Sequence, residues 1–280
     1  MAELPVKMLV LDLDGTLLND QKIISARSKK ALAKLHENGV VIVFASGRTN
    51  FMMSLYKEPY VVCDYHLSFN GGMIEELRTG EILYQVSIKP EIAKQVWQYL
   101  SIKSDIYTCY TKDTMFFSDV SRKTILNRTQ NYIDLANNEK IEMNPYIIEL
   151  GKEEMPKNFP NNILKFVAYE KDQNWVASFK DFIGTLSNLR ADSTGYGLTG
   201  VFNKSVSKEA AIRVLCKRLN IPTVAVAAFG DYENDLNMFN VAGIKVAMEN
   251  ATESLKKQAD YICPDNNSDG VARFIEEYLL

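Results

Sequence analysis

Residues 7–20 read KMLVLDLDGTLLND and place two aspartates directly after an apolar run. In a strand, residues two apart point the same way, so the carboxylates of Asp12 and Asp14 face one side. Two carboxylates so close repel each other unless a cation or a shared proton lies between them. The stretch therefore predicts a buried strand that ends at a site for a cation.

Further apolar runs indicate the rest of the sheet: VVIVFAS at 40–46, VAVAAFGD at 224–231 and IKVAM at 244–248. Continuous runs rich in valine and isoleucine are typical of strands covered on both faces. Helical stretches alternate with them, one at 25–39 with Ser25 as N-cap, the other at 207–222 with Ser207 as N-cap. This order predicts a doubly wound α/β fold around a parallel sheet with right-handed crossovers.

The middle of the chain is richer in Tyr, Phe, Asn and Lys, and alternating segments there surround helical ones. This pattern predicts an α+β domain inserted into the first one. We expect the insert at 83–190 and the core at 1–82 and 191–280.

Composition limits the class of protein. The formal net charge is −3, and no stretch combines basic residues with interleaved aromatics, which argues against nucleic acid as a partner. The apolar runs are far shorter than the roughly 20 residues of a membrane span, and the N-terminus lacks a signal-peptide pattern. Four scattered cysteines suggest reduced thiols. We expect a cytoplasmic protein, a monomer or weak homodimer.

The sequence DLDGT at 12–16 supports a functional reading of its aspartates. A lone Asp-x-Asp is more often a cap and a turn residue. However, D-x-D-G-T is expected by chance in only roughly 0.2% of chains of this length. It also follows a strand at the carboxyl edge, where open α/β sheets bind their ligands.

Three other places offer groups for an anion or a cation. Ser46 and Gly47 follow a buried strand in a turn that can hold a phosphate oxygen, although such a turn is more often only a cap. Arg48 can reach an anion or lie on the surface. Lys208 begins a helix, where its charge opposes the helix dipole; this is tolerated if the side chain neutralises a carboxylate or a phosphate. On sequence alone, Lys204 is an alternative candidate for that role.

The third strand end reads GDYEND at 230–235 and supplies Asp231, Asn234 and Asp235. Mg²⁺ prefers hard oxygen ligands, typically one or two carboxylates together with water and a substrate phosphate. Because the carboxyl ends of parallel strands meet at one edge of the sheet, the cation required by the first motif is expected beside Asp12, Asp14 and Asp231.

These motifs in this order resemble the haloacid dehalogenase superfamily of phosphotransferases: DLDGT at 12–16, ASGR at 45–48, Lys208, and GDYEND at 230–235. The C-terminal stretch at 242–279 is similar to the Cof-type branch, which carries a large α/β cap between its second and third motifs. The resemblance implies a Mg²⁺-dependent phosphatase that acts on small phosphorylated metabolites, such as sugar phosphates or cofactor-related phosphates.

The resemblance also implies roles for the residues. Asp12 would be the nucleophile that forms an aspartyl-phosphate, and Asp14 the general acid and base. Ser46 and Lys208 would bind the phosphate. Mg²⁺ would lie between the carboxylates of Asp12 and Asp231 and the backbone carbonyl of Asp14.

The remaining motif positions are expected to support this set. Gly47, Arg48 and Asn234 would contact the phosphate region. Asp235 would hold Lys208 or the metal's waters, and Asn70 would belong to an Asn-Gly turn near the site.

Other functions remain open on the residues alone. A phosphomutase or phosphotransferase shares the phospho-aspartate and delivers it to a sugar hydroxyl instead of water. A catalytically silent phosphate-binding relative would share the fold. A dehalogenase is disfavoured, because a nucleophile that attacks carbon needs neither Asp14 nor a metal-binding Asp231.

Overall fold

The computed structural model describes residues 5–118, 122–141, 146–150, 159–170, 172–193 and 197–280. The chain divides into two compact units, each considered by itself below. The first unit contains Met1–Gly47, Tyr56–Gln85 and Ser207–Leu280, and the second contains Arg48–Leu55 and Val86–Val206.

The first unit is built on an eight-stranded sheet in which β1 is central. Met8 to Leu11 pair in parallel with β12 on one side and β2 on the other, and every residue of β1 is buried. In the order of the sheet its strands are β14 (Tyr261–Cys263), β13 (Ile244–Met248), β12 (Val226–Gly230), β1 (Met8–Leu11), β2 (Val41–Ala45), β3 (Tyr65–Ser68), β4 (Met73–Glu76) and β5 (Glu81–Gln85).

The six strands from β14 to β3 are parallel, which confirms the α/β core. The sheet is not parallel throughout, because β4 pairs antiparallel with β3 and β5 antiparallel with β4. These two strands are joined to their neighbours by turns, with no crossover helix. Gly71 and Gly80 both have positive φ angles in these turns, a conformation that glycine adopts without strain.

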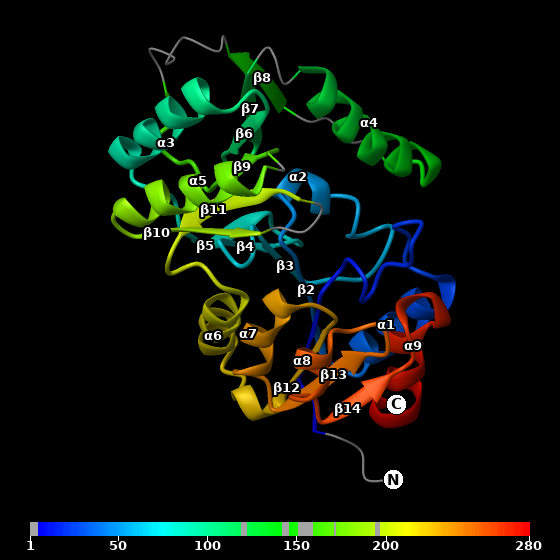
Figure 1. The fold of residues 1–280 in the computed structure, drawn as a ribbon. Coiled ribbons are helices and arrows are strands. Elements are labelled where there is room, and N and C mark those ends of the chain that lie inside the picture. Colours follow the sequence, from blue (N-terminus) through cyan, green and yellow to red (C-terminus); the bar gives the residue numbers. More distant parts are fainter. Residues whose placement is uncertain (1–4, 119–121, 142–145, 151–158, 171, 194–196) are drawn as a thin grey trace. The chain divides into compact units, whose positions relative to one another are not determined.

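Helices of the first unit lie on both sides of this sheet (Figure 1). The predicted caps are present: Ser25 accepts a hydrogen bond from the Ser28 backbone, and Ser207 accepts one from the Ala210 backbone. The α-helices are α1 (Ala26–Glu37), α6 (Lys208–Leu219), α7 (Leu236–Phe239), α8 (Glu253–Lys256) and α9 (Gly270–Phe274); short 3₁₀ turns are η2 (Thr223–Ala225), η3 (Glu233–Asp235) and η4 (Asn266–Ser268), and η5 (Ile275–Leu279) is a π-helical end.

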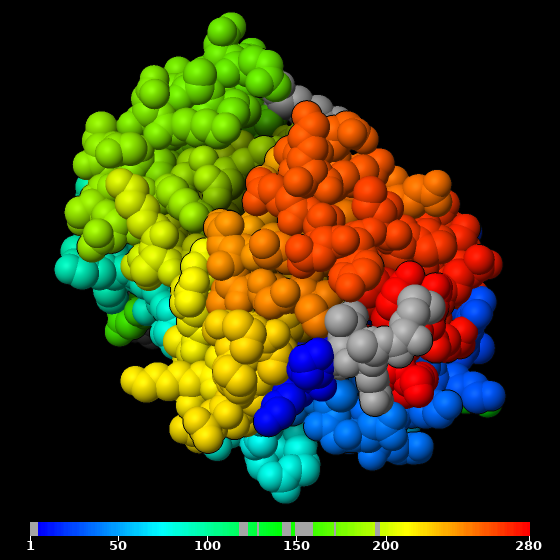
Figure 2. All heavy atoms as spheres, turned by 90° about the horizontal axis from the view of Figure 1, so that it is seen from below, coloured from blue at the N-terminus to red at the C-terminus, as the bar shows by residue number. Residues whose placement is uncertain are grey.

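The C-terminal helices pack against α1 within this unit. Arg27 of α1 forms an ion pair with Glu276, whose oxygen lies 2.5 Å from the guanidinium. In the space-filling view, the red C-terminal atoms border blue atoms from the N-terminal part of the chain (Figure 2). The two ends of the sequence therefore belong to one folded unit.

The second unit contains a six-stranded sheet that is antiparallel except between β7 and β8. One face is covered by α3 and α5, whose buried residues share a hydrophobic core with the strands. In sheet order the strands are β10 (Leu189–Ser193), β11 (Thr199–Asn203), β9 (Lys165–Ala168), β6 (Tyr107–Tyr110), β7 (Thr114–Ser118) and β8 (Tyr146–Leu150); the helices are α2 (Asn50–Met53), α3 (Pro90–Lys103), α4 (Arg122–Asn138) and α5 (Gln173–Thr185).

The aromatic residues of β6 and β7 divide between the two faces of that sheet. Tyr107 and Phe116 belong to the core beneath α3 and α5. Tyr110 and Phe117 occupy alternate positions, so they point to the opposite face. All four are buried.

The second unit has other bounds than the insert expected at 83–190: residues 83–85 belong to β5 of the first unit's sheet, and the second unit runs from Val86 to Val206. Leu189–Ser193 and Thr199–Asn203 pair with each other, and β11 pairs with β9, so the segment up to Val206 belongs to this sheet. The short segment Arg48–Leu55 also belongs to this unit. The extension to Val206 has no local sequence signal, since it depends on the pairing of β11 with β9, about 30 residues earlier in the chain.

Within the described parts of the chain, none of the helices combines the length and the apolar character needed to cross a membrane.

Candidate active site

The nucleophile candidate Asp12 lies at the carboxyl end of β1, at the centre of the first unit's sheet. Its side chain is 8% exposed, and its backbone N–H donates to the carbonyl of Phe229 in β12. Lys208 Nζ lies 2.5 Å from Asp12 Oδ1. The first residue of α6 thus reaches a strand end 196 positions earlier in the sequence.

Lys208 joins Asp12 to a second acidic residue. Its Nζ also donates to Asp235 Oδ1 at 2.7 Å, and both side chains are 1% exposed. The other oxygen of Asp235 accepts the backbone N–H groups of Asp231 and Tyr232, at 3.0 and 3.2 Å. Donors therefore engage both oxygens of Asp235, which fixes the end of Lys208.

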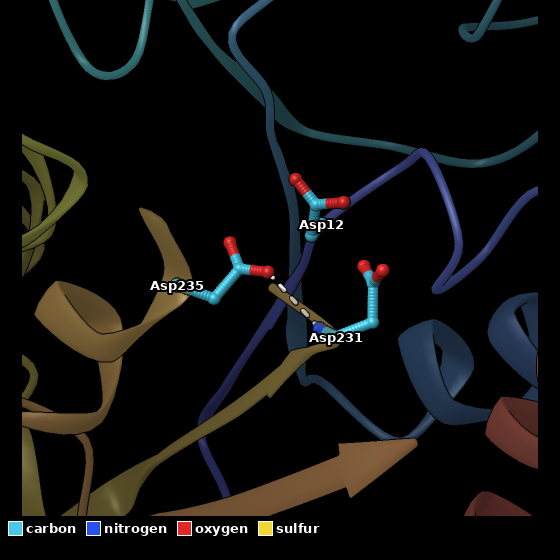
Figure 3. A group of neighbouring side chains, drawn as sticks. All are labelled: Asp12, Asp231 and Asp235. Carbon is cyan, nitrogen blue, oxygen red and sulfur yellow. Dashed lines mark hydrogen bonds between the residues drawn. The ribbon is translucent and has the colours of Figure 1, made fainter. Parts of the chain in front are cut away.

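Asp231 follows β12 and completes the group (Figure 3). One carboxylate oxygen each from Asp12, Asp231 and Asp235 lies within 4.8 Å of the others. The Thr16 hydroxyl donates to Asp231 Oδ1 at 2.9 Å. Gly15 has a φ of 81°, and a Cβ at that position would overlap the Asp231 carboxylate. The glycine of DLDGT is therefore needed for both its backbone conformation and its lack of a side chain.

The charges of this group are only partly balanced. Burial and the charge of Asp235 raise the pKa of Asp12 well above its usual range, although Lys208 pulls it down. Burial and the same Asp235 charge raise the pKa of Asp231 to about 7. Burial alone would lower the pKa of Lys208, but the charges of Asp12 and Asp235 outweigh it and raise that pKa. One ammonium thus faces three carboxylates.

This imbalance fits a divalent cation. Buried carboxylates without a counter-charge favour their protonated form, and a cation within reach reverses that preference. Because Asp235 is occupied by Lys208 and two backbone donors, the oxygens best suited to a cation belong to Asp12 and Asp231. A set of hard oxygen ligands of this kind suits Mg²⁺.

The turns after β2 and β3 lie close to the start of α6. The Asn70 backbone N–H donates to the carbonyl of Ser46 at 2.9 Å. A Cβ on Gly47 would lie 2.7 Å from Asn70 Oδ1, and one on Gly71 would overlap the Ser207 carbonyl. The Ser-Gly turn, the Asn-Gly turn and the first turn of α6 are therefore packed together, and the buried Ser46 lies among them.

The prediction also included Arg48, Asn234 and Asp14 as site residues. Arg48 belongs to the second unit, where its guanidinium carbon lies 5.3 Å from the centre of the Tyr132 ring. Asn234 is exposed in η3. The Asp14 carboxylate pairs with Lys22 at 2.8 Å and is not part of the three-carboxylate group. The strand pattern placed the carboxylates of Asp12 and Asp14 on one side, but β1 ends at Leu11 and only the Asp12 carboxylate belongs to the group. The Asp14 carbonyl, which the resemblance gives to the metal, stays a prediction.

Sequence reasoning missed several residues that support the site. Thr16 holds Asp231. The Asn250 side chain donates to the Gly15 carbonyl at 2.8 Å, and the Thr252 backbone N–H donates to the Asp231 carbonyl at 2.9 Å. Thr16 could have been found as the last residue of DLDGT. The contacts of Asn250 and Thr252 have no local signal, since they join loops more than 20 residues apart or at opposite ends of the chain.

Known proteins resemble this chain over nearly its whole length. The chain is 27% identical to the 5-amino-6-(5-phospho-D-ribitylamino)uracil phosphatase YwtE of Bacillus subtilis, with 98% of each chain covered. It is 29% identical to a putative phosphatase of Streptococcus pyogenes, over 98% of this chain and 99% of that one. A haloacid dehalogenase-like hydrolase from Bacteroides thetaiotaomicron has the same fold, with a TM-score of 0.82, 25% identity, and 97% and 98% of the chains covered.

A family model described as haloacid dehalogenase-like hydrolase matches residues 9–275. The match begins in β1 and ends in η5, so it takes in every motif on which the resemblance was based. The chain therefore belongs to the haloacid dehalogenase-like hydrolases, as its sequence motifs predicted.

Proposed function

We propose that this protein is a Mg²⁺-dependent phosphatase that hydrolyses small phosphomonoesters through a covalent aspartyl-phosphate intermediate on Asp12. The observation that carries the proposal is the buried contact between Asp12, Lys208 and Asp235, with Asp231 beside it. A carboxylate, an ammonium and a cation site within one buried group are what nucleophilic phosphoryl transfer requires.

Asp12 and Asp231 are the proposed Mg²⁺ ligands, together with the Asp14 carbonyl that the family resemblance implies. The cation would supply positive charge beside the phosphate oxygens and keep both carboxylates ionised. The raised pKa values of Asp12 and Asp231 support this, because they mark carboxylates that lack enough positive charge around them.

The Asp12 carboxylate attacks phosphorus, and the bond from phosphorus to the leaving oxygen breaks. That oxygen takes the electron pair and receives a proton from Asp14. In the second step Asp14 accepts a proton from water as the water oxygen attacks phosphorus, which releases Asp12 and inorganic phosphate. Lys208 and the Ser46–Gly47 turn are proposed to bind the phosphate oxygens as their charge changes.

The substrate class rests on the relatives. YwtE and YitU of Bacillus subtilis are named as phosphatases of a phosphoribitylamino-uracil, a small phosphomonoester, and YitU is 24% identical to this chain. We infer that this protein also acts on a small phosphorylated metabolite, with the second unit as a cap that selects the leaving group. Four buried free cysteines support a reducing compartment such as the cytoplasm.

The test is release of inorganic phosphate from a panel of sugar phosphates and cofactor-related phosphate esters, with Mg²⁺ and with a chelator. We expect hydrolysis that needs Mg²⁺ and that the Asp12→Asn variant lacks. Activity that is undiminished by the chelator would contradict the metal assignment. Transfer of labelled phosphate to a second sugar in place of water would identify a phosphotransferase, and binding without turnover would identify a silent relative.

A further inference from the structure

Lys22 contacts the proposed general acid and base directly. Its Nζ lies 2.8 Å from Asp14 Oδ1, and the two side chains are 34% and 35% exposed. Asp14 and Lys22 both belong to the first unit. The pair therefore lies where solvent or a substrate can reach it, unlike the deeply buried pair of Asp12 and Lys208.

The backbone at Lys22 has an unfavourable conformation. Its φ angle is 63°, in the left-handed region that few residues other than glycine and asparagine adopt. The surrounding turn holds it there. The Lys22 backbone N–H donates to the Asn19 carbonyl at 2.9 Å, and the Tyr56 hydroxyl donates to the Lys22 carbonyl at 3.1 Å.

The Asn19 side chain fixes the rest of this turn. Its Oδ1 accepts the backbone N–H groups of Gln21 and Ile23, each at 3.0 Å. Glycine or asparagine at position 22 would fit this backbone with less strain. A lysine held in such a conformation suggests that its side chain, and not its backbone preference, is what the position needs.

We propose that Lys22 is a positioning residue that holds the Asp14 carboxyl group for proton transfer to the leaving oxygen. The proposal rests on the proposed phosphatase function. The Lys22 ammonium contacts Oδ1 and so fixes the orientation of the carboxyl group. In the first step the electron pair of the breaking phosphorus–oxygen bond goes to the leaving oxygen, and the carboxyl proton of Asp14 follows it. Lys22 keeps its own proton throughout.

Leaving groups that differ in basicity separate this role from a structural one. An alkoxide needs a proton as it leaves, whereas a p-nitrophenolate leaves readily without one. The constant kcat/KM covers steps up to formation of the phospho-aspartate, where Asp14 acts as the acid. Without Lys22, kcat/KM is therefore expected to fall much further for alkyl phosphates than for p-nitrophenyl phosphate.

The experiment measures kcat/KM for a series of aryl and alkyl phosphates with Mg²⁺ in the wild type, Lys22→Met and Lys22→Arg. We expect Lys22→Met to lose at least tenfold more activity on alkyl than on p-nitrophenyl phosphate, and Lys22→Arg to recover most of that difference. Lys30→Met, which removes an exposed charge from α1, is the control and is expected to follow the wild type.

Lys22→Gly separates catalysis from folding, because it removes the side chain and relieves the backbone strain. We expect its Tm to equal or exceed that of the wild type while the selective loss on alkyl phosphates remains. An equal loss on every ester in Lys22→Met, or no loss, overturns the role of Lys22 and leaves the phosphatase proposal intact. A wild type that hydrolyses none of the esters overturns the phosphatase proposal itself.

Discussion

At the scale of single residues, we expect substitutions of Gly15 and Lys208 to lower phosphatase activity the most. Gly15→Ala forces an alanine into a φ of 81° and pushes its Cβ against the Asp231 carboxylate. We expect Mg²⁺ binding and phosphatase activity to be lost together, measured by calorimetry and phosphate release.

Gly39 provides a matched control for this change. Its φ is 84°, but a Cβ there would have nothing within 4 Å. Gly39→Ala should therefore cost only the backbone penalty, about 1 kcal/mol of unfolding free energy, and keep full activity. If both variants behave alike, the contact between Gly15 and Asp231 is not what the site requires.

Lys208 is expected to contribute through its charge at Asp12. Lys208→Ala should lower kcat by about 10²-fold or more, on the scale of losing one donor that stabilises a transition-state charge. The control is Lys204→Ala, because Lys204 is exposed and was the rival candidate on sequence alone. A large loss in Lys204→Ala with little effect in Lys208→Ala would show that the third motif has been misplaced.

At the scale of elements, β3 contains a buried histidine that makes folding sensitive to acid. Burial lowers the pKa of His66 to about 4, and a ring nitrogen lies 2.8 Å from the Tyr56 carbonyl. The unfolded chain binds a proton below about pH 6.5, and the folded chain does not until its pKa is reached. Stability from this residue is therefore complete above pH 6.5 and declines as the pH falls towards 4.

The expected loss is about 2 kcal/mol of unfolding free energy between pH 7.5 and pH 5, from a single histidine with this shift. Urea unfolding at several pH values measures it. His66→Gln should remove that part of the slope, and the control His36→Gln, on the half-buried face of α1, should keep it. An acid slope that is unchanged in His66→Gln would contradict the assignment.

The elements also show what sequence can predict. The segments that form β1, β2, β12 and β13 are continuous apolar runs, so their strand type and their alternation with helices along the chain were predicted. The hairpin of β4 and β5 was missed, since MIEELRTGEILYQ at 73–85 is short, half polar and without strong alternation. Its antiparallel pairing depends on turns, not on the hydrophobic pattern that identified the parallel strands.

The same limit applies to the site. Asp12, Lys208 and Asp235 were predicted because each lies in a motif at the end of a strand or the start of a helix. The contact of Lys22 with Asp14 was not, because it depends on a left-handed turn with no distinctive sequence. The position of Arg48 in the second unit depends on contacts distant in the chain.

At the scale of the whole molecule, the second unit is proposed to select the leaving group. All eight strands of the first unit's sheet lie outside Val86–Val206. A chain in which a short Gly/Ser linker replaces this segment should therefore fold, as circular dichroism can show, and bind Mg²⁺. We expect the spread of kcat/KM across the ester panel to collapse in the trimmed chain. An unchanged order and spread of preferences would place specificity in the first unit.

Phosphoryl transfer through Asp12 predicts a covalent phosphoenzyme, and trapping that intermediate is the decisive measurement. The Asp14→Asn variant lacks the base that activates water, so a phosphoenzyme should accumulate when it is mixed with p-nitrophenyl phosphate and quenched in acid. Peptide mapping by mass spectrometry is expected to find one phosphoryl group on Asp12, and none in the Asp12→Asn variant. A phosphoryl group on another residue, or a burst of p-nitrophenol without modification of Asp12, would contradict the account.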